Sequence, residues 1–383
     1  MRALPWVAAA LLAVLAGFAL VPAFAELIAD GGDDLAARVD ESRQLWGRIS
    51  PWGRGPTAAV YPPATYVLHG PLSFFSERTV AWMWGVSALL LVAWLGSALA
   101  RQAQEAVAPV AFAAAFAIHG VAHGLAAGQL HVHTTAAAVL ACLLLIQRHG
   151  SWGTDALGAL LMICALAKPT LAAPFVLLLL PGRRRPLLLV VGGYVALTGV
   201  GLALVGEGLR PLVLWLDVAR EGVEFGAQGS YANVHALTQW LGLDRANTVL
   251  SVALLGGLLA WALSLPDDDD LDRTWVRLGL VAVFARVFAY HQSYDDALLI
   301  LTLGGLVTAA RVRSARPALA VFGAIVVAQL APPSLLGLES PTPGVLPVMR
   351  LALWLAAAWL LWRAQQSGYP RRGTEGNGGG QDT

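Results

Sequence analysis

Long apolar segments separated by short polar loops dominate this chain. A helix needs about 20 mainly apolar residues to cross the hydrocarbon core of a bilayer. Segments near or somewhat below that length lie at residues 5–25, 79–100, 107–126, 132–147, 186–206, 247–265, 275–290, 295–310, 317–333 and 345–362. The pattern therefore predicts an all-α, polytopic membrane protein.

Two shorter apolar segments, 154–167 and 170–181, lie on either side of Lys168, the only lysine in the chain. At roughly 12 to 14 residues each, they are too short to cross a bilayer independently and upright. We expect a pair of broken or re-entrant helices, which a membrane tolerates only where the break is buried in protein or lines a wet cavity. With this pair, the bundle has about 10–12 spans.

The composition agrees with a membrane protein and excludes some partners. Hydrophobic residues make up 57% of the chain and charged residues only 13%, whereas roughly a quarter of the residues in soluble domains are charged. The net charge is +1, and the arginines are scattered among short loops, so we expect no nucleic-acid partner. Both cysteines lie in apolar segments, which excludes a disulfide framework and a CxxC metal site.

Arginines predict the orientation, because cytoplasmic loops of membrane proteins are enriched in Lys and Arg. With the N-terminus inside, the predicted inner loops hold Arg101, Arg148, Arg183, Arg184, Arg185, Arg311, Arg313, Arg316, Arg363, Arg371 and Arg372. The acidic run DDDDLD at 267–272 also falls inside, where we expect a solvated linker. Residues 1–363 then form a single integral membrane domain, and the tail at 364–383 is a disordered cytoplasmic segment.

The first apolar segment ends in Ala23, Phe24 and Ala25, which has the form of a signal-peptidase site. Its apolar stretch exceeds the usual signal-peptide core of about 7 to 15 residues, so we favour a retained first helix. In either case we expect the following loop, 26–77, on the outer side of the membrane. A second long outer loop, 207–246, contains two short amphipathic pieces.

The first outer loop carries the pattern of a short helix lying in the membrane interface. One face is mainly apolar and comprises Leu35, Val39, Ser42, Trp46 and Ile49. The charged residues expected to point elsewhere are Arg38, Glu41 and Arg43.

Asp33 and Asp34 open this helix, and two interpretations are left open. They cap the helix and complement its dipole, or one of them is a general base, since two adjacent carboxylates near a low-dielectric surface raise one pKa. Capping and catalysis can also divide between the two residues.

Lys168 is expected at the outward tip of the short helix pair, where an unpaired charge is costly. One interpretation is that Lys168 extends to the lipid headgroups or pairs with a buried acid. The other is that it binds a phosphate, because an ammonium is a strong point-charge donor to phosphate oxygens. Arg286, near the outer end of a later span, either holds a phosphate as well or pairs with Asp295 or Asp296.

Four histidines gather near the third span and its outer end. His119 and His123 are one helical turn apart, and His131 and His133 follow Gln129. Such a group fits either a zinc site or hydrogen bonds between packed helices. No HExxH pattern accompanies them, so we assign no metal.

Five motifs follow one another along the chain. They are YPPATYVLHGPL at 61–72, a tryptophan-bearing span at 82–95, GQLH at 128–131, AKPTLAAPFVLLLL at 167–180 followed by three arginines, and SYDDALLILTL at 293–303. In this order they resemble glycosyltransferase family 87, whose members are polytopic enzymes of the C-type glycosyltransferase fold. These enzymes use polyprenyl-phosphate sugars, typically of mannose or arabinofuranose, outside the cytoplasmic membrane. The resemblance covers about residues 26–310 and implies the same fold, activity and bacterial-type cell membrane here.

The resemblance also implies roles for individual positions. The family's early acidic residue best matches Asp34, with Asp33 adjacent, and the basic residue of its KP motif matches Lys168. Where many members have GQN, this chain has GQLH, and no proline precedes SYDD. The side chains expected to bind substrate are Tyr61, Gln129, His131, His291, Tyr294 and Asp295.

We therefore expect an inverting membrane glycosyltransferase that moves a mannose- or arabinose-like sugar from polyprenyl phosphate to a glycolipid or polysaccharide acceptor. Asp34 is the expected general base, while Lys168 and Arg286 stabilise the leaving phosphate. The lipid-linked sugar is a substrate, and we expect no cofactor. Two alternatives are a transporter or flippase of a lipid-linked glycan, and a metalloenzyme built on the histidines.

Overall fold

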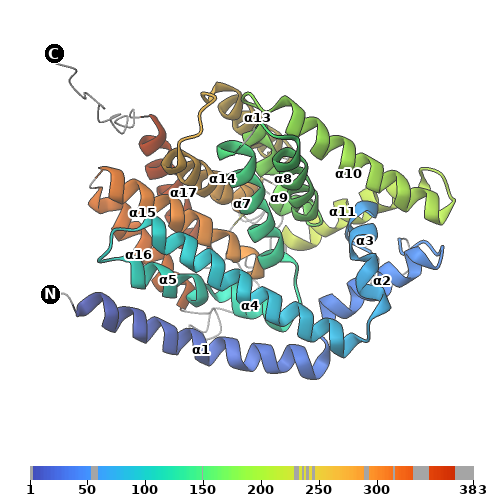
Figure 1. Ribbon diagram of the computed structural model, residues 1–383, viewed down its shortest axis with the longest axis horizontal. Coiled ribbons are helices and arrows are strands. Elements are labelled where there is room, and N and C mark those ends of the chain that lie inside the picture. The colour runs from blue at the N-terminus through green and yellow to red at the C-terminus, as the bar shows by residue number, and fades with distance from the viewer. Residues whose placement is uncertain are drawn as a thin grey trace, which may run out of the picture.

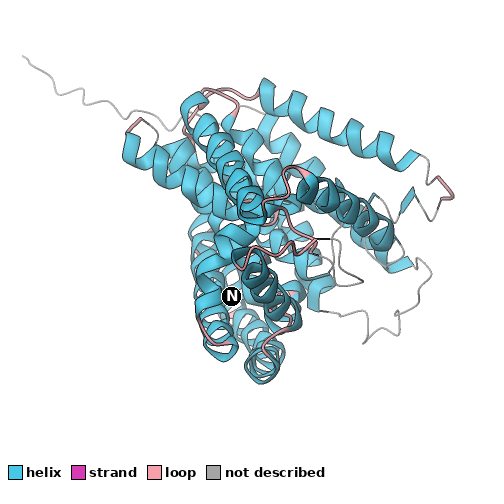
Figure 2. Ribbon diagram, turned by 90° about the vertical axis from the view of Figure 1, so that its right-hand side faces the viewer, coloured by secondary structure: helices cyan, strands magenta, loops and turns pink. Residues whose placement is uncertain are grey.

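The computed structural model describes residues 3–52, 59–148, 150–227, 233–234, 237–238, 241–243, 246–288, 293–313, 315–330 and 345–366. Every regular element in these ranges is a helix (Figure 2). The predicted all-α membrane bundle is confirmed.

Each of the predicted apolar segments is helical over its described residues. The corresponding elements are α1 (Leu4–Asp30), α4 (Glu77–Gln102), α5 (Ala108–Ala117) with α6 (His119–Ala126), α7 (His131–Gln147), α8 (Trp152–Ala165), α9 (Pro169–Val176) with η3 (Leu177–Leu179), α10 (Arg184–Val205), α13 (Asn247–Ser264), α14 (Leu271–Phe288), η5 (Ser293–Leu298) with α15 (Leu299–Arg313), α16 (Arg316–Leu330) and α17 (Val345–Gln366). Helix α17 extends into the predicted tail, because residues 364–366 are helical, and 367–383 lie outside the described residues.

Among the described residues, four helical stretches are long and apolar enough to cross a membrane, namely Leu4–Trp46, Glu77–Gln102, Ala108–Ala126 and Arg184–Val205. The first of these contains α1 and then α2 (Asp33–Trp46), which are separated by two glycines with left-handed φ. Only α1 is apolar. Helix α2 carries the charged residues Asp33, Asp34, Arg38, Asp40, Glu41 and Arg43, so it lies outside the membrane-spanning part.

The bundle is built around α14 and α15, whose residues are buried along almost their whole length. Their backbones approach closely, since a Cβ on Gly279 would lie 3.0 Å from the Leu301 carbonyl oxygen and one on Gly305 would lie 3.2 Å from that of Trp275. Small residues at helix contacts are typical of membrane bundles, where close packing replaces the hydrophobic effect. Helices α7, α9 and α17 pack against α14, while α1 and α4 cover α5 (Figure 1).

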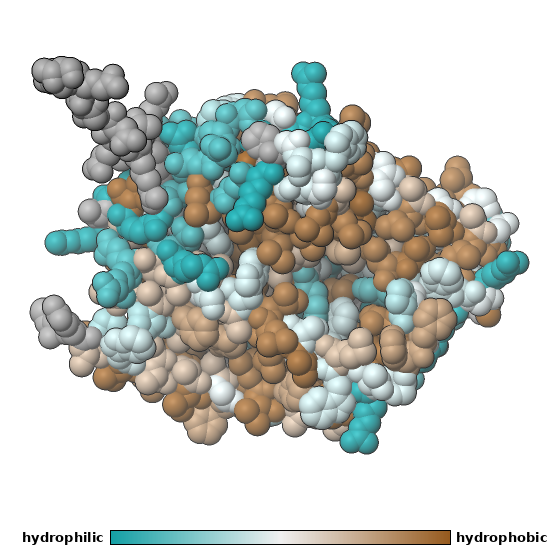
Figure 3. Space-filling view, viewed as in Figure 1, coloured by the Kyte–Doolittle hydropathy of each residue, from teal (hydrophilic) through white to brown (hydrophobic). Residues whose placement is uncertain are grey.

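The outer faces of the peripheral helices are apolar. Large side chains are exposed along α1, α10 and α13, among them Phe18, Leu188 and Leu263. Figure 3 shows hydrophobic residues over most of one face, with hydrophilic residues gathered toward its upper left and lower right edges. This distribution is expected of a protein whose girdle contacts lipid.

The acidic run at 267–272 is exposed over most of its length, as expected of a solvated linker. Three of its five acids also form ion pairs. Asp267 pairs with Arg183 at 2.7 Å, and Asp268 pairs with Arg277 at 3.0 Å. Asp272 pairs with Arg311 at the end of α15. The run thus links the start of α14 to the predicted inner loops that hold Arg183 and Arg311.

Short helices occupy the two long loops that were predicted to face outward. The first holds α2, α3 (Pro63–His69) and η2 (Gly70–Phe74), and the second holds α11 (Arg210–Ala227). The two loops touch, because the indole of Trp215 donates a hydrogen bond to the Val60 carbonyl at 3.2 Å. Leu45, Trp52, Ala59 and Tyr66 form a small apolar core beneath this contact.

Candidate active site

Helix α2 begins against the turn between α6 and α7. The Asp34 amide donates a hydrogen bond to the Ala127 carbonyl at 3.1 Å. Gly32 and Gly128 have φ of 68° and 69°, and a Cβ on Gly128 would lie 2.5 Å from that of Leu35. Both the backbone conformation and the close contact require glycine at 128. The first turn of α2 is therefore fixed over the GQLH motif.

Gln129 links Asp34, the predicted general base, to Lys168, the predicted donor-binding residue. Its amide nitrogen donates a hydrogen bond to Asp34 Oδ2, and its amide oxygen accepts one from Lys168 Nζ at 3.4 Å. The main chain of Gln129 is held as well, because its carbonyl accepts a hydrogen bond from the indole of Trp84 at 3.3 Å. An amide suits this position, since it offers a donor to the carboxylate and an acceptor to the ammonium.

Lys168 lies at the break between α8 and α9, as predicted for the short helix pair. It is the N-cap residue of α9, with Pro169 at the first helical position. The carbonyl of Ala167 at the break accepts a hydrogen bond from Thr65 Oγ1 at 2.8 Å. The YPPAT motif of the first outer loop thus covers the broken backbone and satisfies one of its polar groups.

The ammonium of Lys168 is paired inside the protein. Its Nζ lies 2.5 Å from Asp295 Oδ1 and 4.6 Å from the centre of the Tyr294 ring. Lys168 is 6% exposed and Asp295 is 2% exposed, so each charge stabilises the other in a region poor in water. The predicted buried acid partner is thus present, beside the same side chains predicted to contact the donor.

The two early aspartates have different surroundings. Gly32 is the N-cap residue of α2, and both aspartates lie in the first turn, where negative charge complements the helix dipole. Asp33 is exposed, whereas Asp34 is half-buried and hydrogen-bonded to Gln129. The geometry distinguishes Asp34 as the residue directed into the site.

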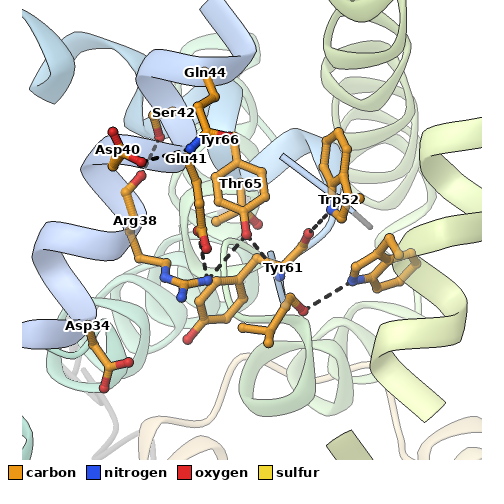
Figure 4. Close-up of polar contacts among 12 residues, drawn as sticks. Asp34, Arg38, Asp40, Glu41, Ser42, Gln44, Trp52, Tyr61, Thr65 and Tyr66 are labelled. Atoms are coloured by element: carbon orange, nitrogen blue, oxygen red, sulfur yellow. Dashed lines mark hydrogen bonds and ion pairs between the residues drawn. The ribbon is translucent and has the colours of Figure 1, made fainter. Parts of the chain in front are cut away.

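The expectation that Arg38 and Glu41 point away from the buried face of α2 is wrong. Glu41 is 5% exposed, and its carboxylate lies 2.8 Å from Arg38 Nη1. The guanidinium lies 5.1 Å from the centre of the Tyr61 ring and donates a 3.3 Å hydrogen bond to Tyr66 Oη (Figure 4). The pair was not predicted because the apolar face of α2 was taken as its only buried face. Asp34, Arg38 and Glu41 are nevertheless spaced at helical intervals, which places them on one side of the helix.

Arg286 is engaged by Asp296 and is separate from the Lys168 pair. Its Nε lies 2.5 Å from Asp296 Oδ1, and both residues are 2% exposed. Gln329 donates a 3.0 Å hydrogen bond to the other carboxylate oxygen, and the guanidinium lies 4.7 Å from the centre of the Trp354 ring. Of the two roles left open for Arg286, this geometry supports pairing, which ties α14, η5, α16 and α17 together.

The histidines do not converge on one point. His133 Nε2 lies 2.8 Å from Ser87 Oγ, and His123 Nδ1 lies 2.7 Å from Ser293 Oγ. His131 is buried beside Tyr294, with 6.2 Å between the ring centres, and no hydrogen-bond partner contacts either ring nitrogen among the described residues. Within those residues, no group of three or more His, Cys, Asp or Glu side chains could hold a metal ion.

Three of the six side chains predicted to bind substrate meet at Lys168. Gln129, Tyr294 and Asp295 contact the lysine directly. The ring of Tyr61 lies beside Arg38, and both residues belong to the loop at 26–77. His291 lies outside the described residues.

Comparisons with known proteins identify the family. The model of glycosyltransferase family 87 matches residues 59–290, a range that includes Tyr61, Gln129 and Lys168 but begins after Asp34 and ends before Asp295. Neither a search of curated proteins nor a search of solved structures found a match. The resemblance predicted from the five motifs is confirmed, because the matched range covers more than half of the chain. This protein belongs to glycosyltransferase family 87 and is a membrane glycosyltransferase.

Proposed function

We propose that this glycosyltransferase moves a mannose- or arabinose-like sugar from a polyprenyl-phosphate donor to a glycolipid or polysaccharide acceptor on the outer side of the membrane. The observation that carries the proposal is the bridge that Gln129 makes between Asp34 and Lys168. It sets a carboxylate and an ammonium on either side of one side chain, as a reaction between an alcohol and a phosphate-linked sugar requires.

Asp34 acts as the general base. The acceptor hydroxyl gives its proton to the carboxylate while its oxygen attacks the anomeric carbon. The bond from that carbon to the phosphate oxygen breaks, and polyprenyl phosphate leaves with the bonding electrons. Direct displacement of this kind inverts the anomeric centre.

Lys168 stabilises the negative charge that develops on the leaving phosphate. An ammonium has three N–H donors, and Asp295 and Gln129 accept two of them. The third is then available to a phosphate oxygen. The pair with Asp295 holds the nitrogen in place before the donor arrives, which lowers the cost of reorganisation during the reaction.

The orientation predicted from the arginines belongs to this proposal. Both termini lie in the cytoplasm, residues 1–363 form one integral membrane domain, and the site faces outward at the level of the lipid headgroups. The isoprenoid chain stays in the bilayer while the sugar and phosphate enter beneath the outer loops. No cofactor is required by this chemistry, because the donor is already activated by its phosphate.

The experiment is a transfer assay with the purified protein in proteoliposomes. Labelled mannose and arabinofuranose are supplied either as polyprenyl-phosphate sugars or as sugar nucleotides. We expect transfer only from a lipid-linked donor, with inversion of the anomeric centre established by NMR. Transfer from a sugar nucleotide would contradict the proposed donor, and movement of labelled lipid between leaflets without a new glycosidic bond would indicate a flippase.

A further inference from the structure

Arg38 and Glu41 form a second charged pair close to the proposed site. Arg38 Nη1 contacts both Glu41, at 2.8 Å, and Tyr66 Oη, at 3.3 Å. A guanidinium has five N–H donors, and the buried Nε of Arg38 has no hydrogen-bond partner among the described residues. One edge of this cation is thus not used by the contacts that hold it in place (Figure 4).

The pair is held rigidly by its neighbours. Tyr66 is completely buried, and its hydroxyl also accepts a 3.1 Å hydrogen bond from the Tyr61 amide. The indole of Trp52 donates to the Tyr61 carbonyl at 3.0 Å. The same α3 segment covers the break at Lys168 through Thr65. Arg38 is therefore positioned by the element that also positions the proposed phosphate-binding lysine.

The side chains next to Lys168 carry more negative than positive charge. Asp34 and Asp295 offset the single ammonium with two carboxylates, so an arriving phosphodiester would enter a region of net negative charge. A second cation is needed to favour an anion there. Arg38 lies one helical turn from Asp34 on α2 and beside the ring of Tyr61, which makes it the described cation best placed to supply that charge.

We propose that Arg38 contacts the phosphodiester of the lipid-linked donor and that Glu41 holds Arg38 in place until the donor binds, when Glu41 takes up a proton. This inference rests on the proposed donor class and extends it by one binding residue and one coupled proton. Guanidinium groups bind phosphate oxygens in pairs, so the unused edge of Arg38 suits this ligand.

Glu41 is suited to taking up a proton. Burial raises the pKa of Glu41 to about 7, even though the charge of Arg38 acts in the opposite direction. The other groups that face this carboxyl are Tyr66 on α3, which donates a hydrogen bond, and Asp40 and Asp34 on α2, whose charges raise the pKa further. A donor anion bound beside Arg38 would compete with ionised Glu41 for the same cation.

The sign of the pH dependence follows from this competition. Below about pH 7 Glu41 is mostly neutral and Arg38 is free to bind the phosphodiester. Above that pH Glu41 is ionised and must gain a proton when the donor binds, so donor affinity falls by up to about tenfold per pH unit. The phosphodiester itself keeps one negative charge throughout this range.

The test measures equilibrium binding of short-chain polyprenyl phosphomannose and polyprenyl phosphoarabinofuranose to the full-length protein in nanodiscs, without acceptor, from about pH 5.5 to 8.5. We expect binding of at least one donor to weaken as pH rises through about 7. In Glu41→Gln the affinity should stay at the wild-type low-pH value across the range. Arg38→Gln should weaken binding by about tenfold or more.

Removing Arg38 alone leaves a buried carboxylate without its partner, so a double variant guards against misfolding. Arg38→Gln with Glu41→Gln keeps the volume of the pair and removes both charges, and it should still lose donor affinity. The matched control is Arg43→Gln with Glu77→Gln, which removes an exposed pair at 3.5 Å that begins on the same helix. We expect donor binding to be unchanged in this control.

The outcomes separate this inference from the donor proposal. If the wild-type protein binds and transfers from a polyprenyl-phosphate donor, but binding is unaffected in both Arg38 variants or keeps its pH dependence in Glu41→Gln, only the role of the pair is overturned. If neither donor binds the wild type, the proposed donor fails and the inference fails with it. Equal competition by phosphatidylglycerol would overturn the donor assignment by identifying a general phospholipid headgroup site.

Discussion

Gln129 accepts a hydrogen bond from Lys168 at 3.4 Å while its amide nitrogen donates to Asp34. The two ends of this amide thus connect Asp34 in the first long loop to Lys168 in the broken helix pair, although these residues are 134 positions apart in sequence. The account of the site depends on this connection, because Asp34 and Lys168 have complementary roles only if they face the same ligand.

Replacing Gln129 tests the bridge. Gln129→Leu removes both hydrogen bonds at similar volume, so we expect kcat to fall by about 10- to 100-fold with a smaller change in donor KM, since positioning is lost but both charges stay. Gln129→Glu places a carboxylate against Asp34 and should lower kcat further. Steady-state kinetics in proteoliposomes separate the two parameters, and a Gln129→Leu enzyme with wild-type kcat would show that the bridge is not needed.

Lys168 is expected to act on the donor. Lys168→Met removes the ammonium, and its effect is best measured together with Asp295→Asn so that no buried carboxylate is left without a partner. We expect the double variant to fold and its apparent donor KM to rise by about 10- to 100-fold, the loss of a charged hydrogen bond. The acceptor KM should change little. A donor KM equal to that of the wild type would remove Lys168 from the phosphate-binding site.

Gly128 is expected to be needed for the docking of α2. Gly128→Ala adds a Cβ 2.5 Å from that of Leu35 at a backbone φ of 69°, so the first turn of α2 has to shift and activity should fall by about tenfold or more. Gly31→Ala is the matched control, because Gly31 also has a left-handed φ, 81°, but nothing lies within 4 Å of its Cβ. Equal activity in the two variants would show that close docking at Gly128 does not matter.

The pair between Arg286 and Asp296 is expected to stabilise the bundle without contacting the donor. Arg286→Met leaves Asp296 buried without its main partner and should lower the free energy of unfolding by about 3–5 kcal/mol. Adding Asp296→Leu should recover much of that loss. Thermal unfolding in detergent measures both effects. A folded double variant whose donor KM rises strongly would instead place Arg286 in the phosphate site.

The exposed pair between Arg210 and Glu207 provides the comparison for that stability measurement. Its atoms lie 3.6 Å apart with side chains 72% and 39% exposed, and pairs of this kind contribute at most about 1 kcal/mol. Arg210→Met should therefore change the melting temperature far less than Arg286→Met. Equal shifts in melting temperature for the two variants would mean that burial of an ion pair does not determine how much stability its loss removes.

The sequence predicted the helices and the location of Lys168 for physical reasons that are local. Apolar length identifies a membrane helix without knowledge of its neighbours, and a single ammonium between two short apolar segments marks a break that needs a partner. Asp295 as that partner was only one of several buried acids the sequence allowed. Choosing it requires the packing of η5 against the helix pair, and no local pattern records that packing.

Other features could not be predicted from local patterns. Ile118 has extended dihedrals that divide the third span into α5 and α6, yet the apolar run there is continuous. The burial of Glu41 was not predicted, because the apolar face of α2 was expected to make all the packing contacts of this helix. The Glu41 carboxylate instead faces Tyr66, which belongs to α3. The ion pairs of Asp267 with Arg183 and of Asp272 with Arg311 were not predicted, because these arginines are distant in sequence.

The central claim is that Asp34, rather than its neighbour, removes the acceptor proton. The direct measurement compares Asp34→Asn with Asp33→Asn in the proteoliposome transfer assay, with donor binding measured in parallel. We predict that Asp34→Asn lowers kcat by about 10²- to 10⁴-fold while donor affinity and expression are retained, and that Asp33→Asn, on the exposed side of the same helical turn, keeps kcat within a few-fold of wild type. Near-normal turnover in Asp34→Asn would contradict the account.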